Sequence, residues 1–196
     1  MNDVIHETVL TTVDRHGRPH VAPMGVRYPA PGQVLLMPFK PSRTLENLLE
    51  TRHAALNIVT DTRVFAGCVT GRRTWAVVPM SELPGVRLAC ALRHLELHLG
   101  EVADDPQRPV LRLGVRADLT HAPFDGLNRA QAAVIEAAVL VSRLHLLPRA
   151  KVDAEMAYLR IAIDKTASAA EHEAWGWLEE AIARHRAAPS TQSQAA

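Results

Sequence analysis

Residues 38–61 read PFKPSRTLENLLETRHAALNIVTD, and this stretch contains a turn, a helix and a strand in succession. It follows the apolar run QVLLM of residues 33–37, and Ser42, Arg43 and Thr44 stand where a helix exposes its unpaired N–H groups. The pattern predicts a helix from Ser42 to Arg52 and a strand over AALNIVT. A strand, a polar turn, a helix and a second strand are therefore expected in this order.

The start of this predicted helix has the chemistry of an anion site. Helix N–H groups and the positive end of the helix dipole both favour a bound anion. The hydroxyls of Ser42 and Thr44 add donors, and Arg43 can offer a bidentate fork to a phosphate. The alternative is that Ser42 is an ordinary helix cap and that Arg43 is solvated.

The hydrophobic period of the sequence changes once, near residue 120. The first part consists of short segments rich in Val, Leu and Thr, separated by turns such as DRHGR and PAPG. Two longer runs alternate, RLACALRHLELHLGEV and VLRLGVRADL, and alternation predicts an inward face with a polar face opposite. The expected inward residues are Ala89, Ala91, Leu95, Leu97, Leu99, Leu111, Leu113, Val115 and Ala117.

After residue 120 the sequence is helical in character. The segment NRAQAAVIEAAVLVSRLHLL is stopped by Pro148, and two further helices are expected over VDAEMAYLRIAI and AEHEAWGWLEEAIARHR. Ser168 and Glu171 have the spacing of a capping box at the start of the last helix. The sequence predicts an α+β protein with a mostly antiparallel β domain at 1–120, a helical region at 121–187 and a disordered tail at 188–196.

The composition excludes several classes of protein. The 196 residues are 47% hydrophobic, which is ample for a core, and the net charge of +1 gives no indication of a nucleic-acid or membrane surface. The first residues contain no long apolar run, so a cytoplasmic protein is expected. Cys68 and Cys90 are expected to be reduced, buried thiols.

The order of the first segments resembles the FMN-binding split-barrel flavoproteins of the flavin-reductase-like branch. The resemblance rests on residues 19–26 (PHVAPMGV), 44–47 (TLEN) and 56–61 (LNIVTD). The later stretch PFDGLNRAQAAVIEAA, with Gly-x-Asn-Arg-Ala followed by Val-Ile-Glu-Ala, is similar to an uncharacterised archaeal and bacterial group with an appended helical region, the DUF447-like proteins. The implied fold is a six-stranded split β-barrel with a C-terminal helical region.

The resemblance also implies a site for FMN. Residues on the strand beside the flavin ring, at the phosphate and along the ribityl chain would be Ala22, Pro23, Met24, Gly25, Val26, Ser42, Arg43, Thr44, Asn47, Asn57, Ile58, Val59 and Thr60. Met24 and Gly25 stand where flavin reductases often have Ser or Asn, so fewer polar contacts to the ring are expected. No catalytic residue follows from the resemblance.

The resemblance therefore predicts an FMN-binding flavoprotein. More specifically, it predicts a flavin-dependent oxidoreductase that acts on a small molecule. The alternative is a non-catalytic accessory protein that binds FMN or another ligand in cofactor metabolism. The expected partners are a small-molecule substrate or electron donor and a second copy of the chain, with no nucleic acid and no membrane. The apolar helix from Arg129 to Leu147 supports a homodimer, because one side of a small barrel cannot cover all its hydrophobic faces.

For several other residues, both a structural role and a functional role are compatible with the sequence. His94, Glu96 and His98 alternate on one strand and could be metal ligands, but the expected interpretation is a polar outer or interfacial face without a metal. Arg129 follows Asn128, and either a ligand or interface role or a plain helix cap would explain the pair. Trp175 and Trp177 cannot share a helix face, so one is expected in the core and the other at a partner surface. The turn with Arg72 and Arg73 could contact a substrate anion or stack on a base, and a solvated loop pair is the expected interpretation.

Overall fold

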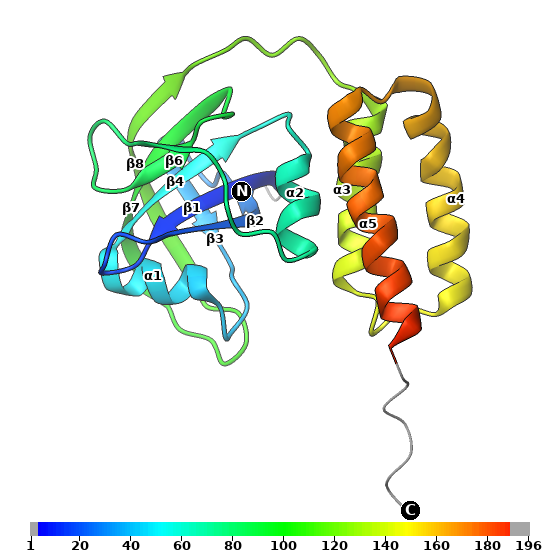
Figure 1. Ribbon diagram of the computed structural model, residues 1–196. Helices are drawn as coiled ribbons and strands as arrows, with labels where there is room; N and C mark the ends of the chain where they lie inside the picture. Colours follow the sequence, from blue (N-terminus) through cyan, green and yellow to red (C-terminus); the bar gives the residue numbers. More distant parts are fainter. Residues whose placement is uncertain (1–3, 189–196) are drawn as a thin grey trace, which may run out of the picture. The chain divides into compact units, whose positions relative to one another are not determined.

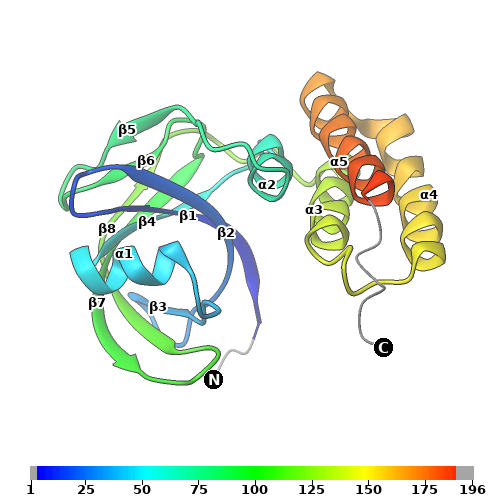
Figure 2. The same cartoon turned by 60° about the horizontal axis from the view of Figure 1, so that its bottom comes forward.

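The computed structural model describes residues 4–188. Its first compact unit is a closed barrel of six antiparallel strands in the order β1–β2–β3–β8–β7–β4 (Figures 1 and 2). The strands are β1 (His6–Val13), β2 (Pro19–Arg27), β3 (Gln33–Leu36), β4 (His53–Ile58), β7 (Arg93–Ala103) and β8 (Val110–Thr120). The predicted six-stranded split barrel with C-terminal helices is confirmed.

The barrel interior is built from the alternating apolar positions of its strands. The buried cluster consists of Leu10, Val26, Val34, Leu36, Leu45, Leu48, Ala54, Leu56, Leu95, Leu97, Leu99, Leu111 and Leu113. Each fully buried Leu or Val contributes about 1.5–3 kcal/mol of transfer free energy. The predicted inward positions of β7 are therefore correct for its three leucines, whereas Ala89 is exposed and lies before the strand.

The predicted first helix is α1 (Arg43–Thr51). Ser42 has an extended backbone, and its side chain accepts a hydrogen bond from the N–H of Leu45 at 3.2 Å, so it caps the helix as its residue type predicts. Leu45 and Leu48 belong to the barrel core, and Figure 2 shows α1 lying across the space that the curved strands enclose. Arg52 ends the helix in the left-handed conformation, with φ of 63°.

A short hairpin of β5 (Val77–Pro79) and β6 (Val86–Leu88) packs against β1 and β4. The hairpin covers part of the outer face of the barrel, so polar side chains on that face are buried. The Glu96 carboxylate accepts hydrogen bonds from the backbone N–H groups of Ser81, Glu82 and Leu83 at 2.6, 2.9 and 2.7 Å. His94 is 2% exposed and Glu96 0% exposed, so of the predicted outer or interfacial face only the interfacial alternative fits these two residues.

A β-bulge changes the alternation of β8. Glu96 pairs with Ala117 and Leu97 with Val115, so the register shifts between them. Because cross-strand neighbours point to the same face, Asp118, which pairs with Leu95, takes the face predicted for Ala117, although its side chain is 46% exposed. The strict alternation assumed from the sequence fails at this bulge.

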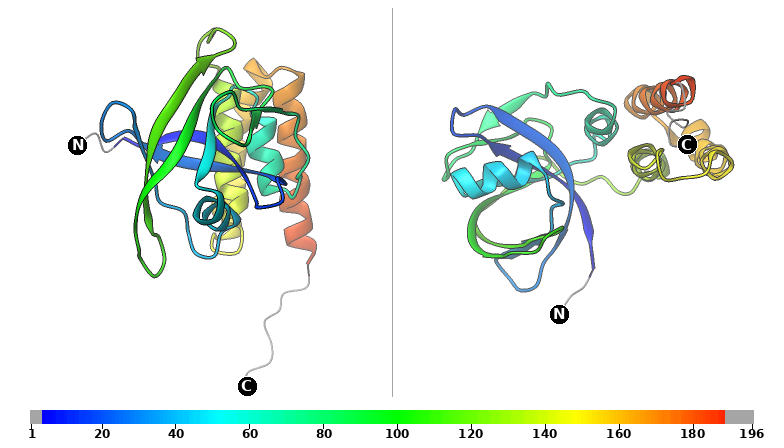
Figure 3. Two further views of the ribbon diagram at one scale, coloured as in Figure 1. Left: turned by 90° about the vertical axis from the view of Figure 1, so that its left-hand side faces the viewer. Right: turned by 90° about the horizontal axis from the view of Figure 1, so that it is seen from below.

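The second compact unit is helical. It consists of residues 61–72 and 127–196, of which the described part contains α2 (Arg63–Val69), α3 (Arg129–Ser142), α4 (Arg149–Thr166) and α5 (Ala169–Ala187). The right-hand view in Figure 3 looks along α3, α4 and α5. The helix α3 packs against the other three helices through Ala133, Val134, Ala137 and Ala138, and the predicted capping box of Ser168 and Glu171 is present.

The division of the chain differs from the predicted 1–120 and 121–187 in one respect. Residues 61–72, including the unpredicted helix α2, belong with the C-terminal helices and not with the barrel. Nearly all of the predicted tail, from residue 189 on, lies outside the described residues. None of the helices within residues 4–188 is long and apolar enough to cross a membrane.

Candidate functional site

The start of α1 lies beside two further basic side chains of the barrel. Asn47 on α1 donates a hydrogen bond to Thr12 on β1 at 2.9 Å, and Thr12 pairs with His20 on β2, so α1 packs over this end of the two strands. Burial lowers the pKa of His20, and the charges of Arg43 and Arg73 lower it further, while Glu46 opposes them. These three basic residues, the His20–Arg43–Arg73 cluster, are close enough for their charges to act on one another, and Arg43 is the first residue of α1.

Two of these groups are available to a ligand. The side chains of Arg43 and Arg73 are exposed, and neither forms an ion pair with another residue of the described chain. Since His20 has a lowered pKa, its ring is a neutral hydrogen-bonding group near pH 7. The cluster can therefore bind an anion with two guanidinium groups, the helix dipole and an imidazole.

The strand segments predicted to lie beside the flavin are brought together across β1. Val9 pairs with Pro23 on one side and with Asn57 on the other, so these two residues are about 10 Å apart, or two strand spacings. Among the predicted residues of the two segments, Gly25 is exposed, and the half-buried ones are Ala22, Pro23, Met24, Ile58, Val59 and Thr60. The structure thus gathers the first and third predicted segments around one strand.

Four predicted site residues have buried side chains. Val26 belongs to the barrel core, Thr44 is 2% exposed, and the Asn47 amide is 4% exposed and bound to Thr12. The Asn57 amide nitrogen approaches the carbonyl oxygens of Val9 and Ala55 and the Thr11 hydroxyl, and its oxygen accepts a hydrogen bond from Leu88 N–H at 2.8 Å.

These contacts give Asn57 a structural role. Its amide joins β1, β4 and the covering strand β6, and its NH₂ group and one acceptor site of its oxygen are used by these contacts. At Asn57, Thr44 and Val26, a ligand would therefore meet the backbone more readily than the side chain.

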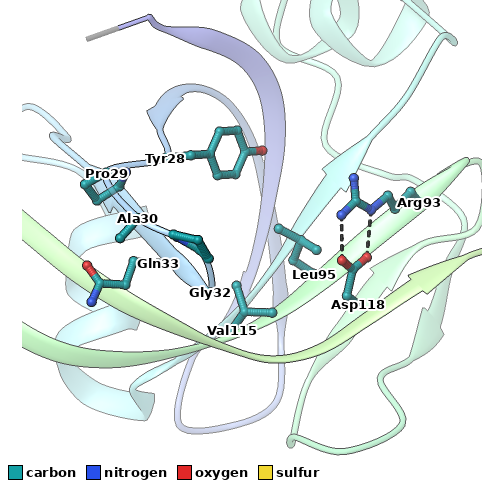
Figure 4. A pocket seen from close by; sticks show the side chains of 10 residues that line it. Tyr28, Pro29, Ala30, Gly32, Gln33, Arg93, Leu95, Val115 and Asp118 are labelled. Atoms are coloured by element: carbon teal, nitrogen blue, oxygen red, sulfur yellow. Dashed lines mark hydrogen bonds and ion pairs between the residues drawn. The ribbon is translucent and has the colours of Figure 1, made fainter. Parts of the chain in front are cut away.

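A hollow of about 370 Å³ lies at another place in the barrel (Figure 4). Its walls include the turn from Tyr28 to Gln33 and the side chains of Leu95 and Val115. Arg93 and Asp118 form a bidentate ion pair in the wall, with N···O distances of 2.7 and 2.5 Å, and Figure 4 shows the Tyr28 hydroxyl pointing toward this side of the hollow. Burial raises the pKa of Tyr28, so its hydroxyl stays protonated at neutral pH.

Sequence reasoning did not identify the residues of this hollow as a site, nor His20. Asp118 was missed because the β-bulge reverses the alternation on β8, and Arg93 because it stands at a strand end. His20 lies within the quoted PHVAPMGV segment, and Arg73 belongs to a turn for which an anion contact was considered beside the expected solvated loop. The only available signal was their basic character, which does not show that they approach Arg43.

The remaining polar candidates have mostly structural surroundings. Asn128 caps α3 by accepting a hydrogen bond from Ala130 N–H at 2.7 Å, and Arg129 lines a hollow of about 260 Å³ between α3 and α4. Trp175 is buried as predicted for one of the two tryptophans, and the Arg72 guanidinium lies 3.8 Å from the centroid of the Trp177 ring, so Arg72 is not simply solvated.

The metal and thiol predictions can also be compared with the structure. Within residues 4–188 no group of three or more His, Cys, Asp or Glu side chains is arranged to hold a metal ion. Cys68 is half-buried and Cys90 is exposed, so the expectation of two buried thiols is wrong for Cys90.

Solved structures with this fold are numerous. An FMN-bound DUF447 protein from Methanosarcina mazei is 23% identical, with a TM-score of 0.76 over 90% of this chain and 94% of that one. The 2-nitrobenzoate 2-nitroreductase of Pseudomonas fluorescens is 17% identical, with a TM-score of 0.51 over 61% of this chain and 68% of that one. The NADH:FAD oxidoreductase of Streptomyces globisporus is 15% identical, with a TM-score of 0.51 over 61% and 78%.

The sequence itself matches two family descriptions. Residues 6–122 match "Protein of unknown function (DUF447) N-terminal domain", and residues 128–180 match "Protein of unknown function (DUF447)". No curated protein matches the sequence. Because the first match alone covers more than half of the chain, and both parts occur in the family's order, the chain belongs to the DUF447 family.

Proposed function

We propose that this protein is a flavoprotein that binds FMN, with the FMN phosphate at the start of α1. The observation that carries the proposal is the capped N-terminus of α1, where Arg43 is the first helical residue and belongs to the His20–Arg43–Arg73 cluster, because it provides donors and positive charge for a phosphate. The protein of the same family from Methanosarcina mazei was solved with FMN bound, which supports the same cofactor here.

The residues of this chain fit such a ligand. Arg43 would hold the phosphate, assisted by Arg73 and by the hydroxyl proton of Ser42, whose oxygen is already engaged with Leu45 N–H. The backbone of residues 22–25 would run beside the ring, on the side of the strand away from Ile5, whose side chain fills the space at Gly25. Bound FMN supplies hydride or electron transfer, and the protein orients it and shapes its surroundings.

More specifically, we propose that the protein is an oxidoreductase that acts on a small molecule. Two similar folds belong to a nitroreductase and to an NADH:FAD oxidoreductase, and these names support redox chemistry. The hollow beside Tyr28 and the Arg93–Asp118 pair is a place for a small substrate.

The test is a spectrum followed by a reduction experiment. Purified protein titrated with FMN is expected to quench flavin fluorescence at one site per chain, and to bind riboflavin more weakly because riboflavin lacks the phosphate. Anaerobic addition of NADH or NADPH should then bleach the flavin band, and air should restore it. Equal binding of riboflavin and FMN would contradict the phosphate site, and binding without reduction would favour the accessory protein over the enzyme.

We also propose a homodimer. In the structure the apolar faces of α3 are covered by the chain's own helices, so α3 no longer supplies the reason for it. The support comes instead from α4, where Tyr158 is 76% exposed and Ile161 48% exposed beside the hollow between α3 and α4.

Multi-angle light scattering at micromolar concentration is expected to give twice the chain mass of 21.5 kDa. Replacing both Tyr158 and Ile161 by serine should return the mass to that of one chain, while the same double change at the exposed residues Ala183 and Ala187 of α5 should leave the dimer intact. A wild-type mass of one chain would disprove the dimer.

A further inference from the structure

Three titratable side chains form a hydrogen-bonded row from the surface to the interior of the barrel. His121, which follows β8, is exposed, and its Nε2 lies 2.8 Å from Nδ1 of His94 on β7. The other nitrogen of His94, Nε2, lies 3.3 Å from Oε1 of Glu96. The last two residues are buried, so the row leads from solvent to a carboxylate without access to water.

The carboxylate at the inner end is ionised. Although burial raises its pKa, hydrogen bonds from Ser81, Glu82 and Leu83 outweigh burial and lower the pKa of Glu96 to about 2. An ionised carboxylate only accepts hydrogen bonds. His94 must therefore carry a proton on Nε2 for its contact with Glu96.

This requirement determines the protonation of the whole row. Neutral His94 has no proton on Nδ1, so its Nδ1 accepts, and His121 must donate from Nε2. The Nδ1 atom of His121 is then the one unprotonated nitrogen of the row that accepts no hydrogen bond within it, and it lies on an exposed ring. We propose that the row His121–His94–Glu96 is a proton relay that takes up and releases one proton at Nδ1 of His121, with His121 positioned by His94 and Glu96.

The proton count balances along the row. When a proton binds to Nδ1 of His121, the proton on its Nε2 can pass to Nδ1 of His94. One N–H bond forms at His121 Nδ1, one breaks at His121 Nε2 and one forms at His94 Nδ1. His121 ends as a neutral ring, and the positive charge lies on His94 beside the Glu96 carboxylate.

The row accepts one proton and no more in this geometry. With a second proton, both nitrogens of the 2.8 Å contact would be donors, and the contact would break. Burial is the main cause of a lowered pKa for both histidines, and the charge of Arg87 on β6 lowers it further. Both rings are therefore neutral at pH 7. Glu96 and Asp118 act in the opposite direction on His94.

The test is an NMR titration of the histidine side chains in the full chain labelled with ¹⁵N-histidine. At pH 7.5 both His94 and His121 are expected to be the Nε2–H tautomer. On acidification their signals should move together with one shared midpoint, for the uptake of one proton by the pair. Separate one-proton midpoints for the two rings, or an Nδ1–H tautomer for His94, would overturn the proposal.

Variants separate a proton relay from a structural hydrogen bond. Glu96→Gln removes the charge beside His94 and should lower the shared midpoint by at least about one pH unit. Ser81→Ala is the matched control, because it removes one hydrogen bond to Glu96 and leaves its charge, and it should move the midpoint by less than about 0.3 unit. An unchanged midpoint in Glu96→Gln would overturn the relay.

A further variant keeps the test decisive if Glu96→Gln fails to fold. His121→Gln changes an exposed residue and replaces the acceptor for a charged His94, so the midpoint of His94 should fall by at least about half a unit. His172→Gln, at an exposed position on α5, should leave His94 unchanged. A His94 midpoint that is the same in both variants would show that His121 takes no part.

Discussion

The Asn57→Ala variant is expected to lose about 2–4 kcal/mol of unfolding free energy, among the largest effects of a single polar substitution in this chain. The substitution leaves the Leu88 N–H without its acceptor and removes the donor to the Val9 carbonyl and the Thr11 hydroxyl, all at a site that is 0% exposed. A buried group without a partner costs about 1–3 kcal/mol, and here several groups lose one partner together.

Asn47→Ala is the matched control. Asn47 is also an asparagine from the predicted site and is 4% exposed, but its side chain makes one hydrogen bond, to Thr12. Its loss is expected to cost about 1 kcal/mol. Urea denaturation followed by circular dichroism, with and without FMN, measures both variants.

The comparison also decides the role of Asn57. If Asn57→Ala weakens FMN binding strongly while its stability stays within about 0.5 kcal/mol of the wild type, the residue contacts the ligand as the family resemblance implies. A large loss of stability with similar affinity for the folded fraction would instead show that it holds the β6 strand against the barrel.

The parts of the fold that were predictable are those governed by local interactions. Ser42 caps α1 and Ser168 with Glu171 caps α5 because a side chain there reaches N–H groups of its own segment. The leucines of β7 reach the core because the period of a strand is two. Neither result requires knowledge of a distant residue.

The parts that were not predictable depend on contacts across the chain. His94 and Glu96 look like an outer face, and they are buried only because residues 81–88 fold over them. Asp118 takes the face predicted for Ala117, with its side chain exposed, because of a bulge, which has no signal in the local pattern.

Helix α2 shows a further limit. It has seven residues, its cap Thr62 makes no side-chain cap hydrogen bond, and its stability comes from packing against α3 and α5, about 60 or more residues later in the chain. Single-sequence reasoning treats such a segment as a loop, because neither its length nor its ends distinguish it.

The candidate site contains one part that was predictable from the sequence and one part that was not. The helix start at Ser42 and Arg43 could be read from the sequence, whereas the approach of His20 and Arg73 could not, because it depends on where residues 73–76 lie on the barrel. The local motif therefore predicts an anion site, and the folded barrel adds positive charge near it.

Arg43→Ala should weaken FMN binding by roughly ten- to a hundred-fold while the fold persists. Arg43 is exposed and makes no ion pair with another described residue, so its removal costs little stability, whereas a charge-assisted bidentate contact to phosphate contributes about 1.5–3 kcal/mol. Titration by flavin fluorescence, with FMN and with riboflavin, measures the effect. Riboflavin lacks the phosphate and should bind the wild type and the variant almost equally.

Two further variants distinguish a phosphate contact from a general change of charge. Arg116→Ala removes an exposed arginine of β8 and should leave both ligands unaffected, while Arg73→Ala should weaken FMN alone, by less than Arg43→Ala, because Arg73 lies on a loop. Raising the salt concentration should reduce the difference between wild type and Arg43→Ala, since a partly exposed ion contact is screened. If Arg43→Ala weakens FMN and riboflavin alike, or neither, the start of α1 is a capped helix and not the phosphate site, and Arg43 is a solvated first-turn residue.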